Sequence, residues 1–132
     1  MADGAASKRP LSPHLQIWRF TVTLAASITH RGTGVVLYGG LLLMALWVIG
    51  LALNPALFAT VSAIIHSPLG FILIVGFVWS LSFHLMNGLR HLYWDSGRGF
   101  ALKTATMTAW LVYIAATLAT ALIIWAGYGG GA

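Results

Sequence analysis

Four ionisable residues lie within or at the end of one hydrophobic run: His84, Arg90, His91 and Asp95. Such side chains cost about 3 kcal/mol each at the centre of a membrane-spanning helix, so their presence there indicates a functional role. At about 100° per residue, a helix would place His84, His91 and Asp95 on one face, together with Gly88. Arg90 would point about a third of a turn away. One face of this segment is therefore expected to carry the polar chemistry.

His84 is the candidate metal ligand of this face. If Asp95 lies at the inner surface, His84 lies about 16 Å deeper, near the middle of the bilayer. A neutral imidazole ligates haem iron well, and Gly88, one turn away, would let a flat macrocycle approach the backbone. His91 lies about 10 Å from His84 along the helix, so a six-coordinate haem would need its second histidine from elsewhere. The alternative is a buried His84 that is hydrogen-bonded to a hydroxyl, such as Ser80.

Structural roles are favoured for the other polar residues of the segment. His91 is expected near the inner interface, where it could orient a neighbouring group or face water. Arg90 could extend its charge to the membrane surface. Asp95 could pair with Arg98 or end the helix. The individual roles of Arg90, His91 and Asp95 therefore stay open.

A second polar cluster precedes the first long apolar run and contains Ser27, His30 and Arg31. Ser27 and Arg31 are four positions apart, so they share a helical face if a helix begins early enough. At the inner interface, a hydroxyl and a guanidinium can donate hydrogen bonds to a carbonyl of a lipid-soluble substrate, and the positive charge favours an anionic reduced form. The alternative is that Arg31 contacts lipid phosphates and sets the topology.

Composition determines which elements must position these residues. The chain is 59% hydrophobic and only 7% charged, whereas about a quarter of the residues of a soluble domain are charged. It has no cysteine, which excludes disulfides and any thiolate-ligated haem, zinc or iron–sulfur cluster held by this chain alone. The formal charge of +5 is scattered around hydrophobic spans without a basic run. This pattern favours a membrane surface over nucleic acid as the partner.

Three apolar runs are long enough to cross a hydrocarbon core of about 30 Å: residues 33–53, 69–92 and 106–125. Asn54 and Pro55 are expected to end the first run, and Pro68 suits the first turn of the second. Residues 54–67 are expected to form a linker. We therefore predict an all-α integral membrane protein with three transmembrane helices, forming a single membrane-anchor domain over residues 1–132. Residues 1–28 would be its cytoplasmic and interfacial segment.

The orientation follows from the basic residues, which all lie before the first span or around the loop between the second and third spans: Lys8, Arg9, Arg19, Arg31, Arg90, Arg98 and Lys103. Loops rich in Lys and Arg stay on the cytoplasmic side. The N-terminus is therefore expected inside and the C-terminus outside.

Two long motifs carry a resemblance to a known family. The first reads Arg9-Pro10-Leu11-Ser12-Pro13-His14-Leu15, followed by Ser27-Ile28-Thr29-His30-Arg31-Gly32-Thr33. The second reads His84-x-x-x-Gly88-Leu89-Arg90-His91-Leu92-Tyr93-Trp94-Asp95-Ser96-Gly97. Together they resemble the cytochrome b subunit of succinate dehydrogenase (respiratory complex II), the larger of its two membrane anchors.

The resemblance implies roles for individual residues. His84 matches the family's axial ligand to the iron of haem b, the other ligand coming from the second small anchor subunit. Ser27 and Arg31 match the quinone-site residues, and His30 and Arg31 are placed to meet the haem propionates. His91 is a possible further member of the haem pocket.

The resemblance also implies partners and an activity. In the family, a flavoprotein subunit oxidises succinate to fumarate, and an iron–sulfur subunit passes the electrons to ubiquinone where it meets the two anchors. This chain would then bind haem, quinone and the lipid bilayer in the respiratory chain and the tricarboxylic acid cycle, without performing the dehydrogenation. A bacterial inner membrane is expected, with the mitochondrial inner membrane as the alternative. The rival functions are a b-type cytochrome subunit of another membrane dehydrogenase and a haem-free structural anchor.

Overall fold

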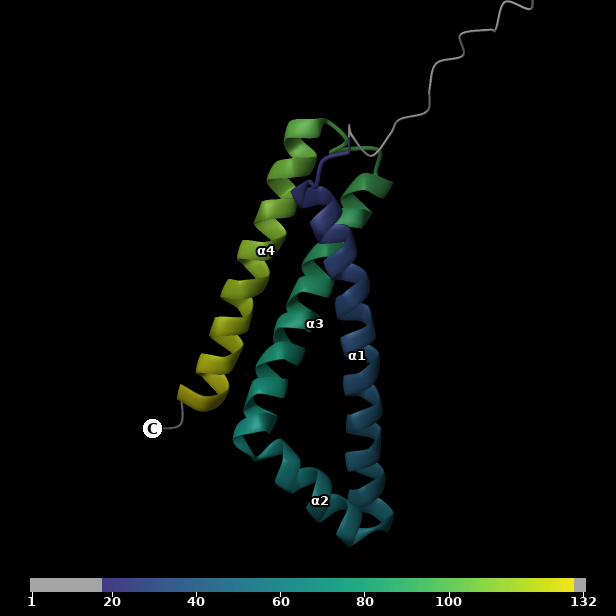
Figure 1. Ribbon diagram of the computed structural model, residues 1–132, viewed down its shortest axis with the longest axis vertical. Coiled ribbons are helices and arrows are strands. Elements are labelled where there is room, and N and C mark those ends of the chain that lie inside the picture. The colour runs from purple at the N-terminus through teal and green to yellow at the C-terminus, as the bar shows by residue number, and fades with distance from the viewer. Residues whose placement is uncertain (1–17, 130–132) are drawn as a thin grey trace, which may run out of the picture.

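The computed structural model describes residues 18–129, and every regular element in this range is helical. The long helices are α1 (Val22–Leu53), α3 (Pro68–Asp95) and α4 (Leu102–Ile124), with the short helix α2 (Pro55–Ile65) between the first two (Figure 1). A π-helical turn, η2 (Trp125–Gly129), continues α4. Within residues 18–129, three helices are long and apolar enough to cross a membrane, which confirms the expected all-α membrane architecture. The motif at residues 9–15 lies outside the described residues.

Side-chain caps set the helix boundaries around α2. The Asn54 backbone N–H donates to the Gly50 carbonyl at the end of α1, and its side chain accepts from the Leu57 N–H at the start of α2. The Ser67 hydroxyl accepts from the Gly70 N–H, and Pro68 occupies the first turn of α3, where its missing N–H costs nothing. The boundaries predicted at Asn54–Pro55 and at Pro68 are confirmed. The linker expected between them is instead the helix α2.

Helix α1 begins at Val22, well before the span expected from residue 33, and contains 32 residues. The Thr21 hydroxyl caps its first turn by accepting the Leu24 N–H at 3.3 Å. At 1.5 Å per residue the helix measures about 48 Å, which exceeds the roughly 30 Å of hydrocarbon. Its early start means that Ser27, His30 and Arg31 lie on a regular helix and therefore have fixed relative positions.

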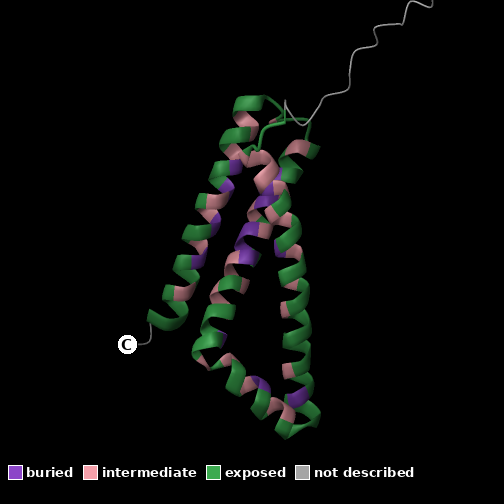
Figure 2. Cartoon of the chain, in the orientation of Figure 1, coloured by how far each residue is buried: buried purple, intermediate pink, exposed green. Residues whose placement is uncertain are grey.

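Helices α1 and α3 pack closely at one end only, whereas α3 and α4 contact each other from the Arg90–Thr108 pair to the Phe71–Tyr128 pair. Helices α1 and α3 approach each other near the loop that joins α3 to α4, and they diverge toward the other end, where α2 bridges the gap (Figure 1). The small core lies on the facing sides of the three long helices (Figure 2), and it consists of Ala26, Phe83, Ala109, Val112 and Ala116. Most of the remaining apolar surface is exposed, as expected where lipid or partner helices cover it.

Hydrogen bonds between side chains tie neighbouring helices together. The hydroxyls of Thr29 on α1 and Tyr113 on α4 lie 2.8 Å apart. The Trp47 indole on α1 donates to the Ser62 hydroxyl on α2 at 3.0 Å. Such bonds satisfy polar groups that lipid could not, so they help to determine how the helices dock.

Substitution of Gly50 is expected to loosen the corner between α1 and α2. A Cβ atom at Gly50 would lie 2.7 Å from the backbone nitrogen of Phe58, so Gly50→Ala forces the two helices apart at a cost of about 1–3 kcal/mol. We expect a lower unfolding temperature for the protein in detergent. Gly39→Ala is the matched control, because its Cβ would meet no atom within 4 Å. Equal unfolding temperatures for the two variants would contradict the close approach.

Candidate functional site

Three histidines from two helices come together at the closely packed end. The His30 ring on α1 stacks on the His84 ring of α3, with centroids 3.8 Å apart and planes inclined by 16°. The His91 ring lies on the other flank of this cluster, 5.3 Å from His30 and inclined by 28°. The two polar clusters noted in the sequence therefore form one site, which we call the imidazole stack (His30, His84 and His91).

The tautomer of His84 follows from its contact with Thr33. The Thr33 hydroxyl donates its proton to the His30 carbonyl at 2.9 Å and lies 3.2 Å from Nδ1 of His84. Because this hydroxyl has used its only proton, it accepts the Nδ1–H of His84. The lone pair of His84 is then on Nε2, which no described residue hydrogen-bonds. Ser80 was the hydroxyl suggested from the sequence, but the partner of His84 is the Thr33 hydroxyl on α1, and the Ser80 hydroxyl donates to the Gly76 carbonyl at 2.8 Å.

Two glycines shape the surroundings of His84. A Cβ atom at Gly34 on α1 would lie only 3.3 Å from Cε1 of His84, so the absence of a side chain lets the imidazole approach the α1 backbone. A Cβ at Gly88, one turn after His84, would meet no described atom within 4 Å. The face expected to receive a flat macrocycle is therefore open at Gly88.

His91 is exposed at the outer end of the stack. Its Nδ1–H donates to the Asn87 carbonyl at 2.7 Å, and its ring meets the Trp94 ring edge-on at a centroid distance of 5.2 Å. Asp95 is the last residue of α3 and is exposed. Its place agrees with the alternative that it ends the helix.

Arg90 corrects an expectation from the sequence. Its side chain does not reach toward the membrane surface but is only 6% exposed, inside the interface of α3 with α4. The guanidinium donates to the Thr108 hydroxyl at 3.1 Å and to the Ala105 carbonyl at 3.0 Å. The first turns of α4 thus offer acceptors close by, so the side chain does not need to extend to water. Its direction away from His84 agrees with the helical face predicted for it.

Ser27 and Arg31 satisfy the geometric condition for a shared site. Both belong to α1, and their separation of four positions places them on one face. Ser27 is half-buried and Arg31 is exposed. Among the described residues, the hydrogen bonds of this part of α1 are made by Thr29 and Thr33. The Ser27 hydroxyl and the Arg31 guanidinium are therefore available to a ligand or a partner chain.

Two buried polar atoms near the stack have no hydrogen-bond partner among the described residues: Nδ1 of His30 and Nδ2 of Asn87. An unpaired buried polar atom costs about 1–3 kcal/mol. The site therefore gains stability if a bound group or a partner supplies the missing contacts. Within residues 18–129, no group of three or more His, Cys, Asp or Glu side chains could hold a metal ion. The donor set instead fits haem, since its iron needs only axial ligands from protein.

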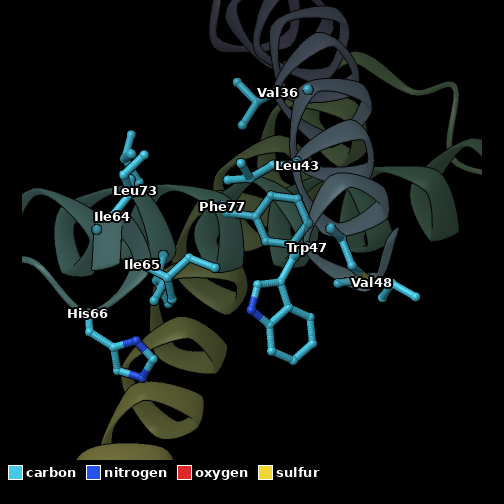
Figure 3. Close-up of a pocket in the computed structure, with 14 residues that line it drawn as sticks. Val36, Leu43, Trp47, Val48, Ile64, Ile65, His66, Leu73 and Phe77 are labelled. Atoms are coloured by element: carbon cyan, nitrogen blue, oxygen red, sulfur yellow. The ribbon is translucent and has the colours of Figure 1, made fainter. Parts of the chain in front are cut away.

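A separate cavity of about 590 Å³ lies between α1, α2 and α3 (Figure 3). It begins nearly two turns beyond the imidazole stack, near Val36, and extends to Trp47 and Ile64. Its lining is almost entirely apolar, with His66 as its one ionisable residue among those that line it. Because no candidate residue of the imidazole stack lines it, the cavity is distinct from the site predicted from the sequence.

Sequence reasoning missed the residues that orient the candidate ligands. Thr33 and Gly34 contact His84, while Asn87 and Thr108 accept hydrogen bonds from the Arg90 guanidinium. A hydroxyl or amide inside an apolar run is a weak signal of such a role, because buried polar groups need partners. Which partner each residue finds depends on how the helices pack.

Comparisons with known proteins give a consistent result. Residues 5–124 match the family described as succinate dehydrogenase/fumarate reductase transmembrane subunit. The succinate dehydrogenase cytochrome b556 subunit of Paracoccus denitrificans is 41% identical over 105 residues, covering 80% of this chain and 81% of that protein. The subunit of the same name from Rickettsia prowazekii is 37% identical over 117 residues, covering 89% and 91%. The mitochondrial succinate dehydrogenase cytochrome b560 subunit of Sus scrofa is 39% identical over 119 residues, covering 86% and 69%.

Proposed function

Because this chain belongs to the family of succinate dehydrogenase/fumarate reductase transmembrane subunits, we propose that it binds haem b and quinone as a membrane anchor of succinate:quinone oxidoreductase. In this role it supports the transfer of electrons from an iron–sulfur subunit to ubiquinone. Succinate oxidation takes place on the partner flavoprotein subunit. The chain itself supplies binding, orientation and a place in the bilayer.

The observation that carries the proposal is the contact between Thr33 and His84. It fixes the imidazole with its proton on Nδ1, 3.2 Å from the hydroxyl oxygen, and leaves the Nε2 lone pair for iron. A ligating histidine characteristically donates its other ring N–H to such a partner, which sets the ring orientation and raises ligand basicity. Stacking on His30 further restricts rotation of the ring.

His30 and His91, the other two residues of the imidazole stack, suit the polar edge of haem b, which carries its propionates. His84 would ligate the iron, with the second axial ligand coming from the second small anchor subunit. His30 and Arg31 would meet the propionates, and His91 would complete the pocket. The unpaired Nδ1 of His30 and the exposed Arg31 guanidinium support this assignment, because both lack partners within the described residues. When bound, haem b supplies a one-electron carrier within the membrane.

Quinone is proposed to bind at Ser27 and Arg31. The hydroxyl and the guanidinium lie on one face of α1 and can both donate to a quinone carbonyl, and the charge stabilises the negative charge that develops on reduction. Their position beside the imidazole stack would bring the haem and quinone sites close together.

The proposed orientation has the N-terminus inside and the C-terminus outside. It is supported by Arg19, Arg31, Arg98 and Lys103, which lie toward the end where α1 begins and where α3 joins α4. The inner membrane of a bacterium is the proposed location, supported by the similarity to the Paracoccus subunit. The mitochondrial inner membrane is the alternative, because the porcine relative is similar over most of this chain.

The function is tested by purifying the tagged chain from its native membrane. We expect a flavoprotein subunit, an iron–sulfur subunit and a second small anchor to copurify, with a low-spin b-type haem spectrum. Other catalytic partners would indicate a cytochrome subunit of a different dehydrogenase. The expected partners without haem absorbance would indicate a structural anchor.

Removal of the Thr33 hydroxyl is expected to alter the haem without removing it. In Thr33→Val, the imidazole Nδ1–H loses its acceptor, so His84 becomes a weaker and less well oriented ligand. Loss of such supporting contacts typically lowers metal affinity or activity about 10- to 100-fold. Redox titration of the purified complex should show a shifted haem midpoint potential, and Thr33→Ser should restore it. A potential unchanged in Thr33→Val would contradict the role of the hydroxyl.

A further inference from the structure

The guanidinium of Arg90 is held inside the α3–α4 interface by three hydrogen bonds. Its Nε donates to the Thr108 hydroxyl at 3.1 Å, and its Nη2 donates to the Ala105 carbonyl at 3.0 Å. Its Nη1 donates to Oδ1 of Asn87 at 3.4 Å. Asn87 is completely buried, and Arg90 is 6% exposed. The plane of the guanidinium is therefore fixed by contacts on both helices.

Stability alone does not account for an arginine at this position. All three acceptors of Arg90 are neutral, so no opposite charge offsets the loss of hydration. Replacing a buried ionic group with a well-packed apolar side chain is often neutral or stabilising. The planar guanidinium with its three hydrogen bonds therefore indicates that this position requires a side chain held in a fixed orientation.

The guanidinium also fixes an aromatic ring that reaches the imidazole stack. Cζ of Arg90 lies 4.0 Å from the centroid of the Trp94 ring, a distance typical of cation–π contact. The Trp94 indole donates to the Gly99 carbonyl at 3.3 Å. Its ring meets His91 at a centroid distance of 5.2 Å and an angle of 75°. Trp94 is thus held by Arg90 and by the following loop, and it contacts His91.

We propose that Arg90 is a positioning residue, which acts through Trp94 to hold His91 and thereby the imidazole stack in register. The proposal rests on the proposed function, because the stack is where haem would bind. His91 contacts His30 at a centroid distance of 5.3 Å, and His30 in turn stacks on His84 at 3.8 Å. Lysine cannot substitute for Arg90, since a point-like ammonium has no plane to stack and no fork of five donors.

The test compares Arg90→Lys and Trp94→Leu in the complete membrane complex. Arg90→Lys keeps the charge but loses the stacked plane and part of the hydrogen bonding. Trp94→Leu keeps the three hydrogen bonds of Arg90 and removes the ring between Arg90 and His91, together with its hydrogen bond to the Gly99 carbonyl. We expect both variants to shift and broaden the low-spin haem signal in electron paramagnetic resonance, and to lower quinone reduction about tenfold through misplacement of the site. Arg90→Lys should also lower the unfolding temperature, because it loses part of the hydrogen bonding between α3 and α4.

Arg98→Lys is the matched control, because Arg98 is exposed in the loop after α3 and the same substitution there should leave the haem signal unchanged. If Arg90 has a purely structural role, Arg90→Lys lowers the unfolding temperature while Arg90→Lys and Trp94→Leu both keep the haem signal of the control. That result would overturn the proposal. An altered haem signal in Arg90→Lys together with a wild-type haem signal in Trp94→Leu would overturn the proposal that Arg90 acts through Trp94. If Arg90→Lys does not assemble, Trp94→Leu decides alone. A wild-type complex without haem would overturn the proposed function as well, which distinguishes the two failures.

Discussion

Replacing His84 with leucine is expected to abolish the wild-type low-spin haem spectrum of the purified complex. Leucine has a similar size but no lone pair, so the iron loses the Nε2 ligand that the Thr33 contact leaves free. Loss of the proposed ligand, or its replacement by another group, would change the spectrum. Optical and electron paramagnetic resonance spectra of the assembled complex measure this directly.

His66→Leu provides the control for this experiment. His66 is an exposed histidine that follows α2, far along the chain from the imidazole stack. Its loss should leave the haem spectrum as in the wild type. An unaltered spectrum in His84→Leu would remove His84 from the role of axial ligand, whatever the effect on activity.

Replacing Arg31 with alanine is expected to separate the two half-reactions of the complex. A hydrogen bond to a charged group is worth about 1.5–3 kcal/mol, so its loss should lower quinone reduction about ten- to a hundredfold. Succinate oxidation with a soluble dye should stay nearly intact, because that chemistry belongs to the partner subunits. The measurement is the ratio of ubiquinone reduction to dye reduction in the same preparation.

Two further variants make the Arg31 result specific. Arg98→Ala removes another exposed arginine and should leave the ratio unchanged. Ser27→Ala removes a neutral donor on the same face of α1, so it should lower the ratio less than Arg31→Ala, since neutral hydrogen bonds contribute about 0.5–1.5 kcal/mol. Wild-type ratios in Arg31→Ala and Ser27→Ala would contradict the quinone site.

The helix ends could be predicted where local chemistry determines them. Asn54, Pro55, Ser67 and Pro68 act on groups within a few residues, so the end of α1 and the start of α3 follow from the sequence. Helix α2 itself was not predicted, because its 11 residues are too few to span a membrane, and a short apolar segment has no preference strong enough to be recognised. The early start of α1 at Val22 was not predicted either. It is set by the Thr21 cap and by the packing of Ala26.

For the polar residues, the sequence indicated which side chains are candidates but not which groups they contact. The cost of placing a charge or an imidazole in an apolar helix depends on the residue alone, so the sequence identified His84, His91, Ser27, His30 and Arg31 as candidates. Their partners depend on atoms from other helices. The acceptors of Arg90 lie on α4, and the hydroxyl beside His84 lies on α1. The alternatives considered for these two side chains, a surface position for Arg90 and a hydrogen bond between His84 and Ser80, therefore differ from the contacts that the structure shows.

The sequence by itself determined the membrane class, the three apolar helices and which residues are the candidates for binding haem and quinone. These properties follow from hydropathy, helical period and the chemistry of single side chains. Only the tertiary structure decided that His30 lies against His84, that the Thr33 hydroxyl lies beside Nδ1 of His84, and that Arg90 joins α3 to α4. Each of these contacts depends on the docking of two helices, because in lipid the specificity of packing comes from close approach and hydrogen bonds between helices rather than from hydrophobicity.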